Sequence, residues 1–285
     1  MLISRTERES LSTILEKIKL KDPKKAKGID KTCKLEQILA YLEIIHSKLR
    51  KYSRKRELVL VDCGAGNCYL SFLTYYFYTV LEKREVTIHC VDTNQKLMDK
   101  CRDKAKDLGF GKMFFHSGDI VDFEVTGKVD MVFSLHACNV ATDKALYFGV
   151  KSGATSILSV SCCQHNIKRR IRNQRYRGIT KHSVYKDKFV SMVGDSLRGL
   201  LMEMQGYKVS IFEFVSSRYT DKNIMLQANK GGVGKLAPIK EEYEKIKAEF
   251  KVAPELETYL NGAEEQFSLE SELADNSYQD WKVAS

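Results

Sequence analysis

The feature that most limits the fold of this chain is a series of five short apolar runs separated by amphipathic stretches, with two further runs close together near the end. The runs cover residues 58–62, 86–91, 112–116, 129–134, 154–160, 207–215 and 223–228. Strands that alternate with helical stretches are typical of βαβ units, whose strands are parallel and whose connections are right-handed. The sequence therefore predicts an α/β fold with a Rossmann-like seven-stranded sheet, closed by a reversed edge hairpin.

Two segments with helical periodicity flank this alternating pattern. Residues 1–56 have apolar side chains at helical spacing and end in a basic cluster, so we expect a basic helical N-terminal segment. Residues 57–229 contain the predicted strands. Residues 230–285 begin with a glycine-rich joint, and residues 236–285 carry 12 Asp and Glu against 5 Lys and Arg. We therefore expect an acidic helical tail after the sheet domain.

The charge distribution points to polyanionic partners. The whole chain has a net charge of +10, but residues 1–235 alone carry 42 basic and 25 acidic side chains, a net charge of +17. A body this basic makes nucleic acid the first partner to consider, although a solvated surface covered by the acidic tail would have the same composition.

The apolar segments and the N-terminus indicate the compartment. No apolar stretch approaches the roughly 20 residues that span a bilayer, so we expect no membrane partner. The N-terminus is charged at once and lacks a secretory apolar region. We therefore expect a cytoplasmic protein whose eight cysteines are thiols. The sequence makes no prediction of the oligomeric state.

A glycine loop follows the first apolar run. Its sequence over residues 62–68 is Asp-Cys-Gly-Ala-Gly-Asn-Cys, and the two glycines allow a tight turn and a close approach of a ligand to the backbone. A dinucleotide fingerprint would require a third glycine at the position of Tyr69. The loop therefore indicates a nucleotide-like ligand but disfavours NAD.

Three aspartates stand at the ends of three consecutive predicted strands. Asp62 is placed to hold a cationic amino group, Asp92 to accept the hydroxyls of a ribose, and Asp119 to contact an adenine amino group. Taken singly, each could be a helix N-cap. Together they fit S-adenosylmethionine better than a phosphate ligand, because its sulfonium and ammonium groups favour negative surroundings. The residues predicted to bind this cofactor are Asp62, Gly64, Ala65, Gly66, Asp92, Thr93, Asp119, Ile120, Ser134 and Leu135.

Two further segments carry a family resemblance. Residues 135–143 read Leu-His-Ala-Cys-Asn-Val-Ala-Thr-Asp, and residues 161–165 read Ser-Cys-Cys-Gln-His. With the glycine loop, they resemble the class I methyltransferases of the methyltransferase-domain-32 type, over residues 34–260, and are similar to eukaryotic tRNA ribose methyltransferases. The resemblance implies a methyltransferase sheet, S-adenosylmethionine-dependent methyl transfer and an RNA substrate. Two positions depart from the family pattern: Cys68 replaces a glycine, and Asn139 replaces an acid or glycine.

The ends of the fourth and fifth predicted strands flank the place where a donor methyl group would point. The candidate catalytic residues there are His136, Asn139, Cys162, Cys163 and His165. Either histidine could take a proton from a hydroxyl acceptor, and Asn139 could orient an amine. The thiols and imidazoles also suggest zinc, but the adjacent cysteines lack zinc-ligand spacing, so we predict no metal. Buried thiols that only pack beneath the cofactor are the simplest alternative.

A strongly basic segment follows these motifs. Residues 168–188 hold nine Lys and Arg against one acid, with Tyr176 and Tyr185 between them. Arginine forks bind phosphates and tyrosine rings stack on bases, so we predict an RNA substrate such as tRNA or rRNA. The predicted substrate-binding residues are Lys168, Arg169, Arg170, Arg172 and Arg175. The alternatives are a solvated helix face, methyl transfer to a protein or small molecule, and an RNA-associated protein that binds the cofactor without turnover.

Overall fold

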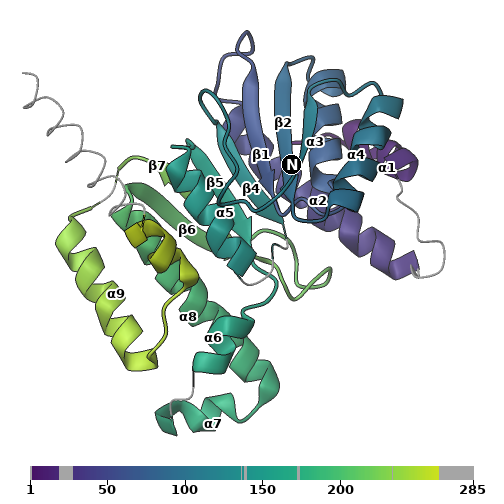
Figure 1. Ribbon diagram of the computed structural model, residues 1–285. Coiled ribbons are helices and arrows are strands. Elements are labelled where there is room, and N and C mark those ends of the chain that lie inside the picture. Colours follow the sequence, from purple (N-terminus) through teal and green to yellow (C-terminus); the bar gives the residue numbers. More distant parts are fainter. Residues whose placement is uncertain are drawn as a thin grey trace, which may run out of the picture.

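A seven-stranded sheet forms the centre of the protein in the computed structural model (Figure 1). The structure describes residues 2–18, 28–135, 137, 140–171, 174–232 and 234–262. The strands are β1 (Leu58–Cys63), β2 (Val86–Asp92), β3 (Met113–Ser117), β4 (Met131–Leu135), β5 (Ser156–Val160), β6 (Tyr207–Glu213) and β7 (Ile224–Lys230). Their order is β3-β2-β1-β4-β5-β7-β6. The predicted α/β fold and all seven predicted strands are confirmed.

The predicted edge hairpin is present, formed by β6 and β7, and β7 is its reversed strand. Strands β1 to β5 are parallel, whereas β7 is antiparallel to both β5 and β6 and lies between them. The reversed strand is therefore internal, and the edge strand β6 runs parallel to the first five. Burial explains this order, because Met225, Leu226 and Ala228 of β7 are buried, whereas Ile211 of β6 is 43% exposed.

Helices cover both faces of the sheet. They are α1 (Arg5–Ile18), α2 (Gly28–Leu49), α3 (Tyr69–Tyr76) with its π-helical extension η1 (Phe77–Leu81), α4 (Gln95–Asp107), α5 (Val140–Lys151), α6 (His165–Arg170), the 3-10 turn η2 (Gln174–Tyr176), α7 (Arg177–Thr180), α8 (Ser183–Met204) and α9 (Leu236–Phe250). Residues 255–262 are also helical. The described parts of both flanking segments are thus helical, as predicted. No helix in the described ranges combines the length and apolar character that a membrane crossing requires.

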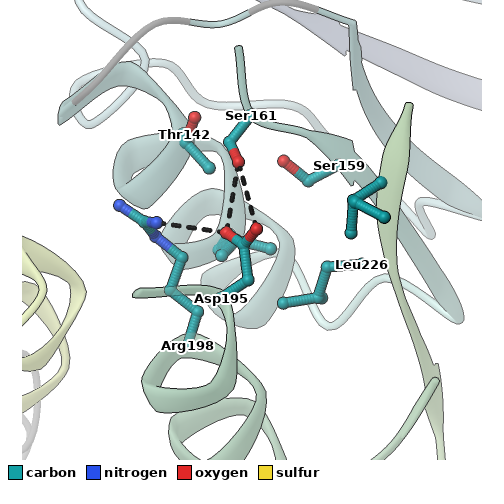
Figure 2. Close-up of a pocket in the computed structure, with 8 residues that line it drawn as sticks. Thr142, Ser159, Ser161, Asp195, Arg198 and Leu226 are labelled. Carbon is teal, nitrogen blue, oxygen red and sulfur yellow. Dashed lines mark hydrogen bonds and ion pairs between the residues drawn. The ribbon is translucent and has the colours of Figure 1, made fainter. Parts of the chain in front are cut away.

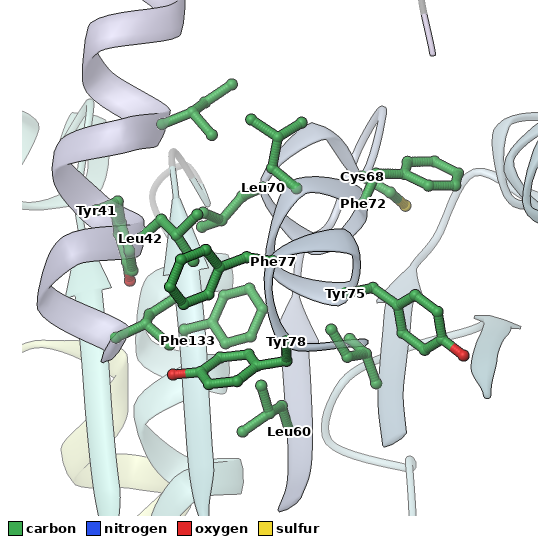
Figure 3. Close-up of a cluster of buried hydrophobic side chains, with 14 of the residues drawn as sticks. Tyr41, Leu42, Leu60, Cys68, Leu70, Phe72, Tyr75, Phe77, Tyr78 and Phe133 are labelled. Carbon is green, nitrogen blue, oxygen red and sulfur yellow. The ribbon is translucent and has the colours of Figure 1, made fainter. Parts of the chain in front are cut away.

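Alternating strand residues supply two separate cores. Leu60 packs with α1 to α4 on one face, and the next residue, Val61, packs with α5, α8 and α9 on the other. Figure 3 shows the first core, where Tyr41 of α2 and Phe133 of β4 lie near the end of α3. Buried residues of α1 and of the C-terminal helices belong to these same cores. The division of the chain at residues 56 and 229 stays a prediction.

A buried tyrosine connects the N-terminal segment to the sheet. The Tyr41 hydroxyl donates a hydrogen bond to the Leu158 carbonyl of β5 at 2.8 Å. It also accepts a hydrogen bond from the Ser134 backbone N–H of β4 at 3.3 Å. A side chain of α2 therefore satisfies backbone groups of two central strands.

Candidate active site

The loop after β1 is shaped by residues with positive φ. Gly64 has φ +73° and Gly66 has φ +52°. The Gly64 N–H donates to the Val91 carbonyl at 2.8 Å, which ties the loop to β2. A Cβ on Gly64 would lie 3.2 Å from the Cβ of Ala137, whereas no atom lies within 4 Å of a Cβ on Gly66. The loop is therefore packed against the end of β4 at Gly64 and open at Gly66.

Cys68, the first departure from the family pattern, has a backbone conformation that glycine adopts more readily than other residues. It has φ 53° and ψ 23°, in the left-handed region, and caps the start of α3. Its side chain is buried in the core with Phe72 and Cys90. The packing of the thiol in the core offsets part of the cost of this left-handed conformation.

Asp92 links the loops after β1 and β2. One carboxylate oxygen accepts the Gly66 N–H at 2.9 Å, and the other accepts the Asn94 N–H at 2.9 Å. Each oxygen has a second lone pair, so the carboxylate retains acceptor capacity for ligand hydroxyls. Its predicted contact with a ribose stays a prediction, as does a role for the exposed Thr93 beside it.

Asp62 is a buried carboxylate with no cationic partner among the described residues. It is 3% exposed and accepts a hydrogen bond from the Ser71 hydroxyl at the start of α3. Burial, reinforced by the charge of Asp92 and partly offset by the Ser71 hydrogen bond, raises the pKa of Asp62 to about 7. A buried, unpaired carboxylate is costly to ionise, so the site favours a ligand that brings a positive charge.

The third predicted acid has a partner of its own. Asp119 forms an ion pair with the Lys144 ammonium of α5 and accepts the Val121 N–H at 3.1 Å. Burial alone would raise the pKa of Asp119, but these contacts hold it below its ordinary value. Ile120 beside it is buried in the second core. A contact of Asp119 with an adenine amino group stays a prediction, and it would compete with Lys144.

The carboxyl ends of β4 and β5 lie side by side. Ser134 of β4 is the register partner of Ser159 of β5, and both hydroxyls are buried without a hydrogen-bond partner among the described residues. Leu135, which ends β4, is half-buried. Of the candidate catalytic residues, His136 and Asn139 lie outside the described residues.

The other three candidate catalytic residues follow β5 directly. Cys162 and Cys163 are half-buried, with their sulfur atoms 3.9 Å apart, and His165 is exposed at the start of α6. The structure thus brings them to the edge of the sheet where β4 also ends. Within the described ranges, no group of three or more His, Cys, Asp or Glu could hold a metal ion.

Two residues that the sequence analysis missed connect the β4 and β5 motifs. Arg198 of α8 is buried and donates to both carboxylate oxygens of Asp143, at 2.7 and 3.1 Å, and to the Gln164 side-chain oxygen at 2.9 Å. Asp195, one turn earlier on α8, accepts hydrogen bonds from Gln164 at 2.9 Å and from the Ser161 hydroxyl at 3.1 Å. Figure 2 shows Asp195 between Ser161 and Arg198. This group of five residues, the Arg198 network, holds the two motif loops together.

Despite burial, the carboxylates of Asp143 and Asp195 raise the pKa of Arg198 in this network, but at Asp195 the dominant effect is burial. Burial raises the pKa of Asp195 even though Arg198 lies beside it, because the desolvation of a carboxylate outweighs the attraction of a cation that is shared with Asp143. The network borders a crevice too narrow to hold a water molecule, which Thr142, Ser159 and Leu226 also line. Its polar atoms are largely bonded to one another, so it serves mainly to fix the loops.

The predicted substrate-binding residues lie along the segment after β5. Lys168, Arg169 and Arg170 belong to α6, and Arg175 belongs to η2. Arg172 lies outside the described residues. Arg169 and Arg170 are both exposed. The basic segment therefore starts at the same sheet edge as the candidate catalytic residues.

Acidic residues of the C-terminal helices contact this segment. Arg170 pairs with Glu255 at 3.1 Å, and Arg175 pairs with Glu249 at 3.1 Å. The Tyr176 hydroxyl also donates to Glu249, at 3.2 Å. The acidic tail therefore packs against the basic segment, and two of the predicted RNA-binding arginines have carboxylate partners.

Residues 33–170 match a family model described as a methyltransferase domain, the methyltransferase-domain-32 family. Residues 33–170 are a methyltransferase domain of this family. The matched segment contains the glycine loop and both motifs at the ends of β4 and β5, and so confirms the predicted resemblance to this family. The predicted similarity to tRNA ribose methyltransferases stays a prediction. The methyltransferase activity and the cofactor S-adenosylmethionine, both predicted from the sequence, are confirmed with it. A search of the curated proteins finds no match.

Solved structures with a similar fold include other methyltransferases. An rRNA methylase from Streptococcus thermophilus is 10% identical, covers 66% of this chain and 95% of its own, and has a TM-score of 0.43. Magnesium protoporphyrin IX methyltransferase from Synechocystis PCC 6803, with bound SAH, is 13% identical, covers 79% and 98%, and has a TM-score of 0.46. Similarities this low carry no argument about the acceptor of the methyltransferase domain.

The residues of the glycine loop fit S-adenosylmethionine. The unpaired carboxylate of Asp62 matches an ammonium group, and Asp92 retains acceptor capacity for ribose hydroxyls. When bound, the cofactor supplies an electrophilic methyl group. The open space at Gly66 lets a ligand approach the backbone there.

Proposed function

We propose that this methyltransferase acts on structured RNA, such as tRNA or rRNA. One observation carries the proposal: residues 168–188 hold nine Lys and Arg against one acid and directly follow β5, at the sheet edge that carries the candidate catalytic residues. Phosphate contacts by such a segment would position an RNA strand next to the motif loops.

The chain would contribute mainly alignment and proton removal. Methyl transfer is an in-line displacement, so a small misplacement of the acceptor slows it strongly. The Arg198 network would limit this misplacement by fixing the loops after β4 and β5 relative to each other. His165 is exposed at this edge, and of the two histidines predicted to take a proton from a hydroxyl acceptor it is the one within the described residues.

A second acceptor class has support of its own. Because Arg170 and Arg175 pair with Glu255 and Glu249, these arginines could serve to dock the C-terminal helices rather than to bind RNA. The same enzyme would then methylate a protein or a small molecule.

Transfer of tritiated methyl groups distinguishes these acceptors. Purified protein is incubated with labelled S-adenosylmethionine and with RNA, protein and metabolite fractions of a cell extract. Label in the RNA fraction supports the proposal. Label only in protein or metabolites would reject it. No label in any fraction would favour the alternative that the protein binds the cofactor and RNA without transferring a methyl group.

The role of the basic segment is tested by the double variant Arg169→Ala and Arg170→Ala. We expect weaker retention of tRNA and a salt dependence reduced by about 2 in the slope of log affinity against log salt, about 1 for each lost phosphate contact. Lys100→Ala with Lys128→Ala, which also removes two exposed cations but from other parts of the surface, is the matched control. Equal retention by both double variants would contradict the assignment.

A further inference from the structure

We infer that α7 and the first turns of α8 form a docking surface for unpaired RNA, on which Tyr185 stacks against a base. This surface, the α7–α8 platform, comprises residues 177–192. The inference rests on the proposed RNA substrate and adds a second contact, further along the basic segment, to the arginines predicted from the sequence. Figure 1 shows α6 and α7 at the end of α8 that lies away from the sheet.

Exposed apolar side chains gather on the platform. The three most exposed large hydrophobic side chains in the described part of the protein are Val184 at 64%, Met192 at 61% and Tyr185 at 59%. Ile179 of α7 is 46% exposed. Single exposed apolar residues are ordinary, but a group of four within 14 residues is typical of a binding surface.

The three exposed apolar side chains of α8 share one side of the helix. Lys188 follows Tyr185 by three residues and Val184 by four, and Met192 follows Tyr185 by seven. Residues at these spacings lie on one face of a helix. The exposed apolar side chains of α8 therefore lie on one face of the helix, with a cation, Lys188, among them.

The platform also carries the cations of the basic segment that have no carboxylate partner within the described ranges. They are Arg177, Lys181, Lys186 and Lys188. The one acid in the segment, Asp187, pairs with Lys168 of α6. Because no carboxylate in the described ranges neutralises these four cations, the cluster attracts a polyanionic ligand such as RNA.

The two tyrosines of the segment have different roles. Tyr176 packs against Phe189 and Phe250, with ring centroids 5.7 and 5.4 Å apart, and its hydroxyl bonds to the tail. The Tyr185 ring meets the His182 ring edge-on, with centroids 6.0 Å apart and an angle of 84° between the rings, and Tyr185 is 59% exposed. Exposed rings among cations are the combination that binds single strands, whose bases are free to stack.

Binding of fluorescein-labelled U20 RNA, followed by anisotropy, tests the inference. We expect wild type to bind U20 more tightly than a 20-base-pair RNA duplex, because only the single strand offers unstacked bases. Tyr185→Ala should weaken U20 binding about tenfold or more, while Tyr185→Phe should retain it. Phe114→Ala, which removes an aromatic ring that is 44% exposed on β3, is the control and should bind like wild type.

The outcomes separate this inference from the proposed function. U20 binding that is unchanged by Tyr185→Ala, or no preference for the single strand, would overturn the platform even if tritiated methyl groups still enter RNA. Methyl transfer to protein alone would overturn the RNA substrate, whatever the U20 result. Wild type that fails to bind U20 would also reject the platform and point to a partner protein for its apolar face. Circular dichroism checks that each variant is folded.

Discussion

The unpaired carboxylate of Asp62 makes the affinity for S-adenosylmethionine depend on pH. Its pKa is raised from 3.8 to about 7 by burial, so the free enzyme holds this carboxyl mostly protonated at pH 5. An ammonium ligand needs the ionised form, whose fraction rises from about 1% at pH 5 to about half at pH 7 for a pKa near 7. The affinity should therefore rise with pH, by at most about 50-fold over this window.

Isothermal titration with wild type and Asp62→Asn measures this effect. The asparagine keeps an acceptor for the Ser71 hydroxyl but cannot ionise. We expect the variant to bind weakly at every pH and to lack the rise between pH 5 and 7. Titration of the cofactor itself is common to both proteins and cancels in the comparison. A wild-type affinity that is flat over this range, or equal affinities of the two proteins, would refute a pairing between Asp62 and the ammonium group.

The same variant should change the stability of the free enzyme. Between about pH 4 and 7 the folded protein holds a proton that the unfolded chain has lost, so the free energy of unfolding falls as pH rises through this window. The cost at pH 8 is at most about 4 kcal/mol. Asp62→Asn should therefore be more stable than wild type at pH 8 in urea unfolding, with the difference shrinking at pH 5. A variant less stable at pH 8 would show that burial is not the dominant effect.

Three further changes have defined outcomes. Arg198→Met leaves two buried aspartates without their cation, so urea unfolding should show a loss of about 3 to 5 kcal/mol; a loss below 1 kcal/mol would mean that the network is dispensable. Gly64→Ala should weaken cofactor binding, measured by calorimetry, because the added Cβ would lie 3.2 Å from the Cβ of Ala137. The control is Gly127→Ala, which has a similar positive φ of +89° but no atom within 4 Å of the added Cβ, and it should leave the affinity unchanged. Equal effects of the two variants would contradict the role of Gly64. Burial and the neighbouring His116 lower the pKa of His89 to about 4. Between pH 4 and 6.5 the unfolded chain therefore binds more protons than the folded protein, so the stability of the fold decreases as the pH drops. His89→Gln should reduce the difference in melting temperature between pH 7 and pH 5.

The strands could be predicted because buried parallel strands have a simple sequence signature. Each is a short apolar run bounded by polar residues, and the structure has a strand within all seven predicted runs. The order of β6 and β7 within the edge hairpin was not predicted, because the sequence pattern shows that the two strands pair but not which of them joins β5. Met225, Leu226, Gln227 and Ala228 are all buried, as expected of an internal strand, although Gln227 is polar.

The site was predicted only where its signal is local. The glycine loop and the two motifs are short strings, and the structure brings them to one sheet edge. Arg198 was missed because a charged residue in a long helix is usually exposed. Asp195 and Arg198 do, however, stand among Val193, Leu197 and Leu201, on a face that is otherwise apolar, and this pattern indicates a buried ion pair.

The partners of the basic segment could not be predicted from composition. Arg170 and Glu255 are 85 residues apart in the chain, and the sequence gives no sign of which carboxylate lies beside which arginine. Asp119 and Lys144, 25 residues apart, are a similar case. Pairing between distant charges depends on how the helices pack, and so it becomes visible only in three dimensions.

The tyrosine that joins α2 to the two central strands has a consequence for any attempt to shorten the protein. Removing residues 1–56 would remove the Tyr41 hydroxyl and leave the Leu158 carbonyl and the Ser134 N–H without this hydrogen-bond partner. It would also expose the apolar side chains that α1 and α2 cover. Amide protons of β4 and β5 should therefore exchange with solvent only as fast as those of α2, in one cooperative opening. The catalytic sheet and its N-terminal helices are in this sense a single thermodynamic unit.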